Sequence, residues 1–335
     1  NTMSVVLFGG SLSTPYIKTT TVGFTGLPSD GVVLSGGTLI ATAASTDFIQ
    51  SHDPTGSWGT RNNVGVGTGG TVIDTNGFDI TITKSMQNYG GAGVITKTGA
   101  GTLRYTNANP YSGGTTVNQG TLLLDGAGGG YARIAGPLTV NSGTAVSFAN
   151  EDGTGLGWID GYKATALTIN GGTVISPVTM HVWNLSGGVN MTGGTLASNN
   201  GTSDANGPQL EWINANVTTN ASADTATIGG RIRMRADGGA PGITFNVADG
   251  AAATDLLVSA AVTEASGGRS ITKTGAGTMV FTGANNYTGT TTVSEGTLSL
   301  SSPVLDDIAP VVIGFDGKMD LNFAGNDTVG SLEIA

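Results

Sequence analysis

The sequence predicts an all-β protein, a right-handed parallel β-helix (β-solenoid) with decorating loops, and three observations lead to the solenoid. Of 335 residues, 57 are glycine, 38% are hydrophobic and only 11% are charged, a composition typical of short strands joined by tight turns. One segment occurs twice. Fragments of that segment recur at steps close to a single solenoid coil, so we expect residues 1–335 to form a single solenoid.

The duplicated unit is found at residues 95–124 and 271–300, and the two copies align without a gap. The first copy reads ITKTGAGTLRYTNANPYSGGTTVNQGTLLL, and 20 of its 30 positions are identical in the second copy. Identity at this level is more than shared composition can produce, so the unit is a true internal duplication.

The second half of the unit has weaker echoes along the chain. The threonine that follows the turn glycine falls at positions 121, 144, 173 and 195. Most of these steps are in the low twenties, which is the length of one coil of a parallel β-helix, and the longer step indicates an insertion. The chain then makes about 14 coils, a stack of roughly 65 Å at the spacing of β-strands.

Each unit is predicted to be a strand, a glycine turn and a second strand. The turn requires a positive φ, which glycine and asparagine tolerate. Val117 and Leu122 flank the turn and should point inward, with Leu124 on the same face as Leu122 because side chains alternate along a strand. Equivalent Asn and Thr side chains of stacked coils can then form hydrogen-bonded ladders.

The duplicated unit resembles the passenger-associated transport repeat, also described as the autotransporter-associated β-strand repeat. The resemblance rests on Thr96, Lys97, Gly99, Gly101, Thr102, Leu103, Asn109, Tyr111, Gly113, Thr115, Val117, Gly120, Thr121 and Leu122, and on Thr272, Lys273, Gly275, Gly277, Thr278, Asn285, Tyr287, Gly289, Val293, Gly296, Thr297 and Leu298. It implies the right-handed form of the β-helix, export to the bacterial surface, and a scaffolding role without chemistry. Lys97 and Lys273 are expected at equivalent, solvent-facing positions.

Three segments interrupt the pattern and are predicted to be loop insertions, near residues 45–66, 150–163 and 198–214. They carry Trp58, Trp158 and Trp212 together with acidic residues, the side chains that commonly bind sugars. Loops that leave a solenoid often carry its function. The alternative is that each tryptophan packs against the side of the solenoid as a small satellite core.

The strand Arg231–Arg235 places Arg231, Arg233 and Arg235 on one face, with Ile232 and Met234 inside. This is the densest basic stretch of an acidic chain, so it could hold a carboxylated glycan or an acidic neighbour. The alternative is a solvated strand face balanced by nearby acids.

Several classes of function are disfavoured. A net charge of −10 argues against nucleic-acid binding, and the absence of cysteine excludes disulfides and thiol catalysis. No apolar run approaches the ~20 residues of a membrane helix. The two D-x-N-G turns lack the later glutamate of a calcium loop, and the two histidines lack a nucleophile context. We therefore expect no enzyme activity, no cofactor and no metal site.

The sequence predicts a strand near each end of the chain, and these two strands suggest a partner. An apolar strand covers Val5, Val6, Leu7 and Phe8, and the last strand carries Leu332 and Ile334. Open β-helix edges invite pairing with another chain. The chain has no visible export signal before Val5, so either a signal was removed or the sequence is part of a longer chain. The alternative to head-to-tail assembly is therefore that neighbouring coils of a longer chain cover these edges.

The sequence accordingly predicts a non-enzymatic extracellular or cell-surface protein, a scaffold or adhesin that could form head-to-tail fibres and contact surface glycans. The alternative is a polysaccharide-binding or polysaccharide-cleaving β-helix that uses the loop tryptophans and acids.

Overall fold

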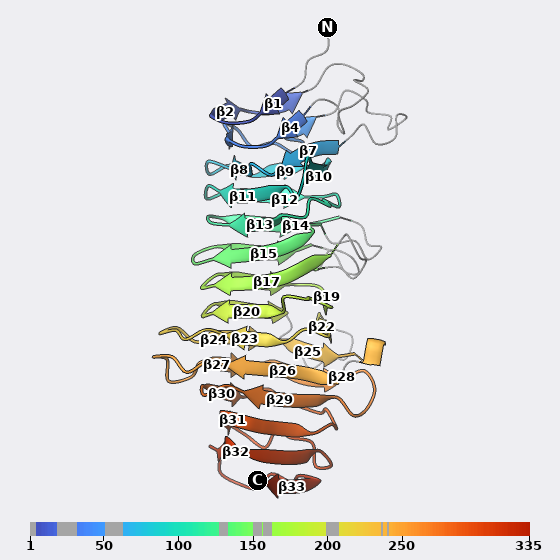
Figure 1. The fold of residues 1–335 in the computed structure, drawn as a ribbon, viewed down its shortest axis with the longest axis vertical. Helices are drawn as coiled ribbons and strands as arrows, with labels where there is room; N and C mark the ends of the chain where they lie inside the picture. The colour runs from blue at the N-terminus through green and yellow to red at the C-terminus, as the bar shows by residue number, and fades with distance from the viewer. Residues whose placement is uncertain are drawn as a thin grey trace. The chain divides into compact units, whose positions relative to one another are not determined.

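The computed structural model describes residues 5–18, 32–50, 63–126, 133–149, 156, 163–198, 208–235, 237–239 and 241–335. Within these ranges the regular structure is β, apart from one 3₁₀ turn, η2 (Asp237–Gly239). The all-β prediction is confirmed. The chain divides into two compact units, Asn1–Thr165 and Ala166–Ala335, and each is a stack of parallel coils (Figure 1).

The first unit pairs its coils along two ladders and two smaller sheets. The first ladder contains β2 (Ser11–Thr14), β5 (Thr38–Ala41), β8 (Thr71–Asp74), β11 (Val94–Thr98), β13 (Gly114–Val117) and β15 (Gly136–Asn141). The second ladder contains β9 (Ile80–Ile82), β12 (Thr102–Tyr105), β14 (Thr121–Leu124) and β16 (Ala145–Phe148). The smaller sheets contain β1 (Val5–Leu7), β4 (Val32–Leu34), β7 (Asn63–Gly67) and β10 (Ser85–Tyr89), and β3 (Ile17–Lys18) with β6 (Ile49–Gln50).

The second unit repeats this plan. Its first ladder contains β17 (Ala164–Asn170), β20 (Val189–Thr192), β23 (Val217–Thr219), β26 (Gly242–Val247) and β29 (Ser270–Thr274). The second contains β18 (Thr173–Ser176), β21 (Thr195–Ser198), β24 (Ala226–Gly229), β27 (Leu256–Val258) and β30 (Thr278–Phe281). Both ladders continue into β31 (Thr291–Leu300), which pairs with β32 (Pro310–Leu321) and through it with β33 (Ser331–Ile334). The third sheet is β19 (Met180–Trp183), β22 (Leu210–Ile213), β25 (Arg231–Met234) and β28 (Ala261–Glu264).

The register of the ladders marks where each coil closes. Lys97 lies opposite Val117, which lies opposite Val140, so one coil runs from Lys97 to Val117 and the next from Val117 to Val140. In the second unit Lys273 lies opposite Val293, in the same register as Lys97 and Val117. The coil from Phe245 to Lys273 is longer, because it includes β28 of the third sheet. The predicted parallel stacking is confirmed.

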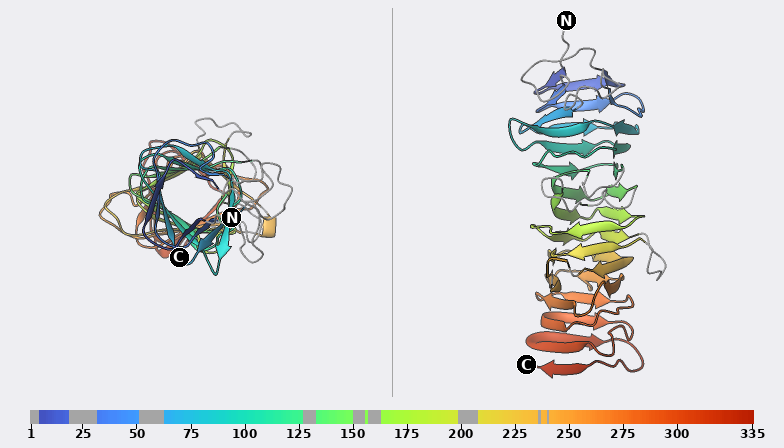
Figure 2. Two further views of the ribbon diagram at one scale, coloured as in Figure 1. Left: turned by 90° about the horizontal axis from the view of Figure 1, so that it is seen from above. Right: turned by 90° about the vertical axis from the view of Figure 1, so that its right-hand side faces the viewer.

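The inward side chains of each strand form the core. In the duplicated unit, Ile95, Leu103, Val117, Leu122 and Leu124 are all fully buried. Viewed from above, the strands of each unit surround this interior (Figure 2). One coil cannot bury its own apolar row, so the stack is held together by contacts between coils.

The glycine turns adopt the conformation that the pattern predicts. Gly120 and Gly296 have φ values of 67° and 68°. A Cβ on Gly120 would also lie 2.5 Å from the carbonyl oxygens of Gly99 and Gly101, in the preceding coil. Glycine is required here both by the left-handed backbone and by the close approach of the neighbouring turn.

Polar ladders run along the outer faces, as expected. Thr96 lies opposite Thr116, which lies opposite Thr139. Asn141 Nδ2 donates to Asn118 Oδ1 at 2.6 Å in the turn of the adjacent coil.

Two of the three predicted insertions contain strands, and most of the third, residues 150–163, lies outside the described residues. Residues 45–66 contain β6 and part of β7, and residues 198–214 contain β22, which is a strand of the third sheet. The repeat pattern in the sequence follows the two long ladders, whereas these strands belong to the other sheets and do not share it.

Candidate functional site

The lysine of the duplicated unit lies inside the coil. Lys97 is completely buried on β11, on the same face as Ile95. Its Nζ donates to the carbonyl oxygens of Thr98, Gly99 and Gln119 at 2.9, 2.7 and 2.9 Å, and to Thr75 Oγ1 at 3.1 Å. The ammonium therefore joins the turns of three successive coils.

The second copy builds the same arrangement. Lys273 is also fully buried, and its Nζ donates to the carbonyl oxygens of Thr274, Gly275 and Glu295 at 3.0, 2.6 and 3.0 Å. These three acceptors stand at the positions of the second copy that correspond to those around Lys97. We refer to each lysine with its carbonyl acceptors as a turn cage. The prediction that both lysines face solvent is wrong, because three converging carbonyl groups replace the water around the ammonium.

The protonation state of the cages follows from their surroundings. Burial lowers the pKa of Lys97 and of Lys273 to about 8, while nearby carboxylates act in the opposite direction. Both side chains are thus predominantly cationic at neutral pH. The three N–H bonds of each ammonium match three carbonyl acceptors, and at Lys97 the Thr75 hydroxyl lies 3.1 Å away as a fourth oxygen that shares these donors. This geometry suits a structural cation rather than a catalytic amine.

Other residues of the repeat also form bonds between or within coils. Asn109 Oδ1 accepts from the backbone N–H of Met86 at 2.8 Å, and Asn285 Oδ1 accepts from that of Val262 at 3.0 Å. The buried hydroxyl groups form pairs in both copies, Tyr111 with Thr115 at 2.6 Å and Tyr287 with Thr291 at 2.7 Å. The polar residues that define the repeat therefore stabilise the coil through hydrogen bonds.

The duplication extends further than the sequence comparison indicated. Asp79 Oδ1 accepts the backbone N–H of Thr102 at 2.7 Å, and Asp255 Oδ2 accepts that of Thr278 at 2.8 Å. The two aspartates are separated by the same offset as the two copies, and both lie upstream of the duplicated unit. Sequence reasoning missed them because the residues between them and the unit differ in the two copies.

Two of the three predicted glycan-binding tryptophans, Trp58 and Trp158, lie outside the described residues. Trp212 is in β22 with 1% of its surface exposed, and its Nε1 donates to the carbonyl of Ala215 at 2.6 Å. The predicted glycan contact by Trp212 is wrong, since its indole packs in the core with Leu210 on the inward face of the strand.

The three arginines lie on β25 and just beyond it, with Ile232 and Met234 buried as predicted. Arg233 and Arg235 donate to the two carboxylate oxygens of Glu211 at 3.0 and 3.2 Å. Glu211 is only 3% exposed. Arg235 also donates to Asp237 at 2.7 Å, which raises the pKa of Arg235 and lowers that of Asp237.

These contacts match the alternative of a face balanced by nearby acids, with Arg231 as the third member of the row. A contact of Arg231, Arg233 and Arg235 with a carboxylated glycan stays a prediction.

The residues predicted to support end-to-end assembly are exposed to different degrees. Leu7 is buried and Val5 half-buried, while Val6 and Phe8 are 44% and 65% exposed. Leu332 and Ile334, in β33, are 58% and 68% exposed. Assembly through them stays a prediction.

Among the described residues, no group of three or more His, Cys, Asp or Glu side chains is arranged to hold a metal ion. In the same part of the chain, no helix is long and apolar enough to cross a membrane.

Parallel coils closed by turn cages define the class of this protein as a parallel β-helix built on an internal repeat. Residues 95–124 and 271–300 match the family model of the passenger-associated-transport-repeat. The chain is 29% identical over 334 residues to the adhesin BmaC autotransporter of Brucella suis biovar 1 (strain 1330).

That alignment covers 91% of this chain but only 9% of the relative. No solved structure gives a significant match. The chain thus carries two passenger-associated-transport repeats and is similar over most of its length to part of an autotransporter adhesin, which indicates secretion to the bacterial cell surface.

Proposed function

We propose that this chain is part of a non-enzymatic surface adhesin, in which the β-helix is a scaffold that carries binding surfaces on its outer face. The observation that carries the proposal is the use of the repeat residues. Lys97, Lys273, Asn109 and Asn285 all bond inside or between coils, so the repeat supplies structure and leaves binding to the outward residues.

The similarity to an adhesin over 91% of the chain supports the same proposal. Because the chain spans about 9% of that relative's length, adhesion by this chain needs its own test. Fluorescent beads coated with the purified chain are allowed to settle on epithelial monolayers, and beads coated with albumin serve as the control. We expect several-fold more retained beads under flow, and equal retention would contradict the proposal.

Head-to-tail assembly is a separate hypothesis, supported by the exposed apolar side chains of Leu332 and Ile334 on β33. Electron microscopy at increasing concentration tests it. Fibres that lengthen with concentration are expected if the ends associate, and isolated particles at every concentration would reject it.

A further inference from the structure

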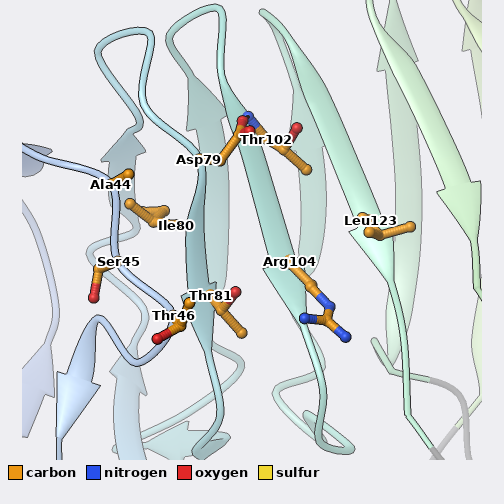
Figure 3. Close-up of a pocket in the computed structure, with 9 residues that line it drawn as sticks. All are labelled: Ala44, Ser45, Thr46, Asp79, Ile80, Thr81, Thr102, Arg104 and Leu123. Carbon is orange, nitrogen blue, oxygen red and sulfur yellow. Dashed lines mark hydrogen bonds between the residues drawn. The ribbon is translucent and has the colours of Figure 1, made fainter.

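A groove crosses the outer face of the second ladder in the first unit (Figure 3). Its volume is about 660 Å³, and it spans the coils of Ser45, β9, β12 and β14. Three strand spacings correspond to a length of roughly 14 Å. It is lined by Ala44, Ser45, Thr46, Asp79, Ile80, Thr81, Thr102, Arg104 and Leu123.

The charged groups of the groove are held in place. Arg104 donates through Nε to Asp125 Oδ2 at 2.7 Å, and its Nη2 contacts the same oxygen. The Arg104 side chain is nevertheless 45% exposed. Asp79 uses Oδ1 for the backbone N–H of Thr102. Within the described residues, Asp79 Oδ2 and Arg104 Nη1 have no hydrogen-bond partner, so both are open to a ligand.

Comparison of the two copies of the unit distinguishes the bonds that build the coil from the side chains on its outer surface. The backbone bond of Asp125 N to Tyr105 O, at 2.8 Å, is reproduced by Ser301 N to Phe281 O, at 3.1 Å. The outward side chains differ, because Val280 replaces Arg104 in the second copy.

Ser301 likewise replaces Asp125, and Leu257 replaces Thr81. The coil therefore forms without the Arg104–Asp125 ion pair and without a hydroxyl at position 81. The coil does not require these outward residues, so in the first unit they can have another role.

We propose that this groove binds a neutral, extended oligosaccharide, an inference that rests on the adhesin function and specifies its ligand. Hydroxyl groups of Ser45, Thr46 and Thr81 line an open channel with Leu123 at one end. A fixed guanidinium and a fixed carboxylate can donate to and accept from adjacent sugar hydroxyls.

The charge of the site favours a neutral ligand. The lining holds one acidic residue, Asp79, and one basic residue, Arg104, so its formal charges cancel. A carboxylated sugar would find no net positive charge in the lining to compensate its own charge, whereas a neutral sugar needs none.

Titration calorimetry with the full chain tests the inference, using cellohexaose, mannohexaose and xylohexaose as neutral probes and hexagalacturonate as the acidic probe. Binding of at least one neutral hexasaccharide is expected, with no binding of hexagalacturonate. Arg104→Gln should weaken binding about tenfold or more, as expected for a charge-assisted hydrogen bond. Lys318→Gln is the matched control, since it removes one positive charge from an exposed side chain in β32, outside the groove.

Circular dichroism verifies that each variant is folded. No binding of any neutral probe, preferential binding of hexagalacturonate, or binding that Arg104→Gln leaves unchanged would each overturn the inference. Bead adhesion that persists in Arg104→Gln would reject the groove as the adhesive site and leave the adhesin proposal intact.

Discussion

The turn cage predicts a large loss of stability for Lys273→Met. The substitution keeps an unbranched side chain but removes three hydrogen bonds, of 3.0, 2.6 and 3.0 Å, to backbone carbonyl groups. Charge-assisted hydrogen bonds contribute about 1.5–3 kcal/mol each, so the gross loss is roughly 4.5–9 kcal/mol. Desolvation of an ammonium costs several kcal/mol and is relieved by the change, which leaves a net loss of about 2–4 kcal/mol.

Urea unfolding, followed by circular dichroism and by hydrogen exchange of the second unit, measures this loss. A net effect of this size lowers the urea midpoint by about 1 M, given an m value of roughly 3 kcal/mol/M. Lys318→Met is the matched control, because that side chain is 66% exposed and lies 3.9 Å from Asp320. Its effect should stay within about 0.5 kcal/mol. A Lys273→Met protein as stable as the wild type would refute the structural role of the cage.

Three further predictions concern Lys273, Gly120 and Tyr287. The folded pKa of Lys273, about 8, lies below the reference value of 10.5, so the unfolded chain binds more protons between these values. The stability of the wild type relative to Lys273→Met should therefore rise from pH 8 to pH 9.5, by up to ~1.4 kcal/mol per pH unit, in urea titrations; a flat difference would argue against a depressed pKa. Gly120→Ala should destabilise by about 2 kcal/mol or more in thermal unfolding, through both strain and contact with carbonyl oxygens 2.5 Å away. Gly143→Ala is its control, with a φ of 73° but nothing within 4 Å of the new Cβ, and a cost as large as that of Gly120→Ala would contradict the contact argument. Tyr287→Phe should cost about 1 kcal/mol, because it removes the 2.7 Å hydrogen bond to Thr291 inside the core, and an unchanged urea midpoint would show that this bond contributes nothing.

Most of the coil could be predicted from the sequence, because the internal duplication and the glycine turns specify which strands stack. The position of Lys97 could have been found as well. In Ile95–Thr98, side chains alternate, so an inward Ile95 places Lys97 inward. The charge of lysine suggested solvent instead. The carbonyl groups that satisfy it come from residues as far apart as Gly99 and Gln119, and only the fold brings these together.

The groove around Arg104 could not be predicted from the sequence, because only the fold brings its lining residues together. Its lining comes from four coils, and the residues of the 44–46 segment precede the duplicated unit by about two coils. Trp212 shows the opposite error, since an aromatic residue in an apparent insertion suggested a surface site. Trp212 lies two residues after Leu210 on β22, so the two side chains share one face of the strand, and this face belongs to the core.

The central claim is that the two halves of each repeat stack in parallel in one defined register, and cysteine cross-linking tests it most directly. The chain has no cysteine, so a pair can be introduced without interference. Thr272 lies opposite Thr292, and neighbouring strands are about 4.8 Å apart, within the reach of a disulfide. Thr272 and Thr290 would be roughly 8 Å apart, beyond that reach. The structure predicts that oxidation joins Thr272→Cys to Thr292→Cys and leaves the Thr272→Cys/Thr290→Cys pair open, as read by peptide mass spectrometry. Cross-linking of the second pair in preference to the first would contradict this register, and the turn cages with it.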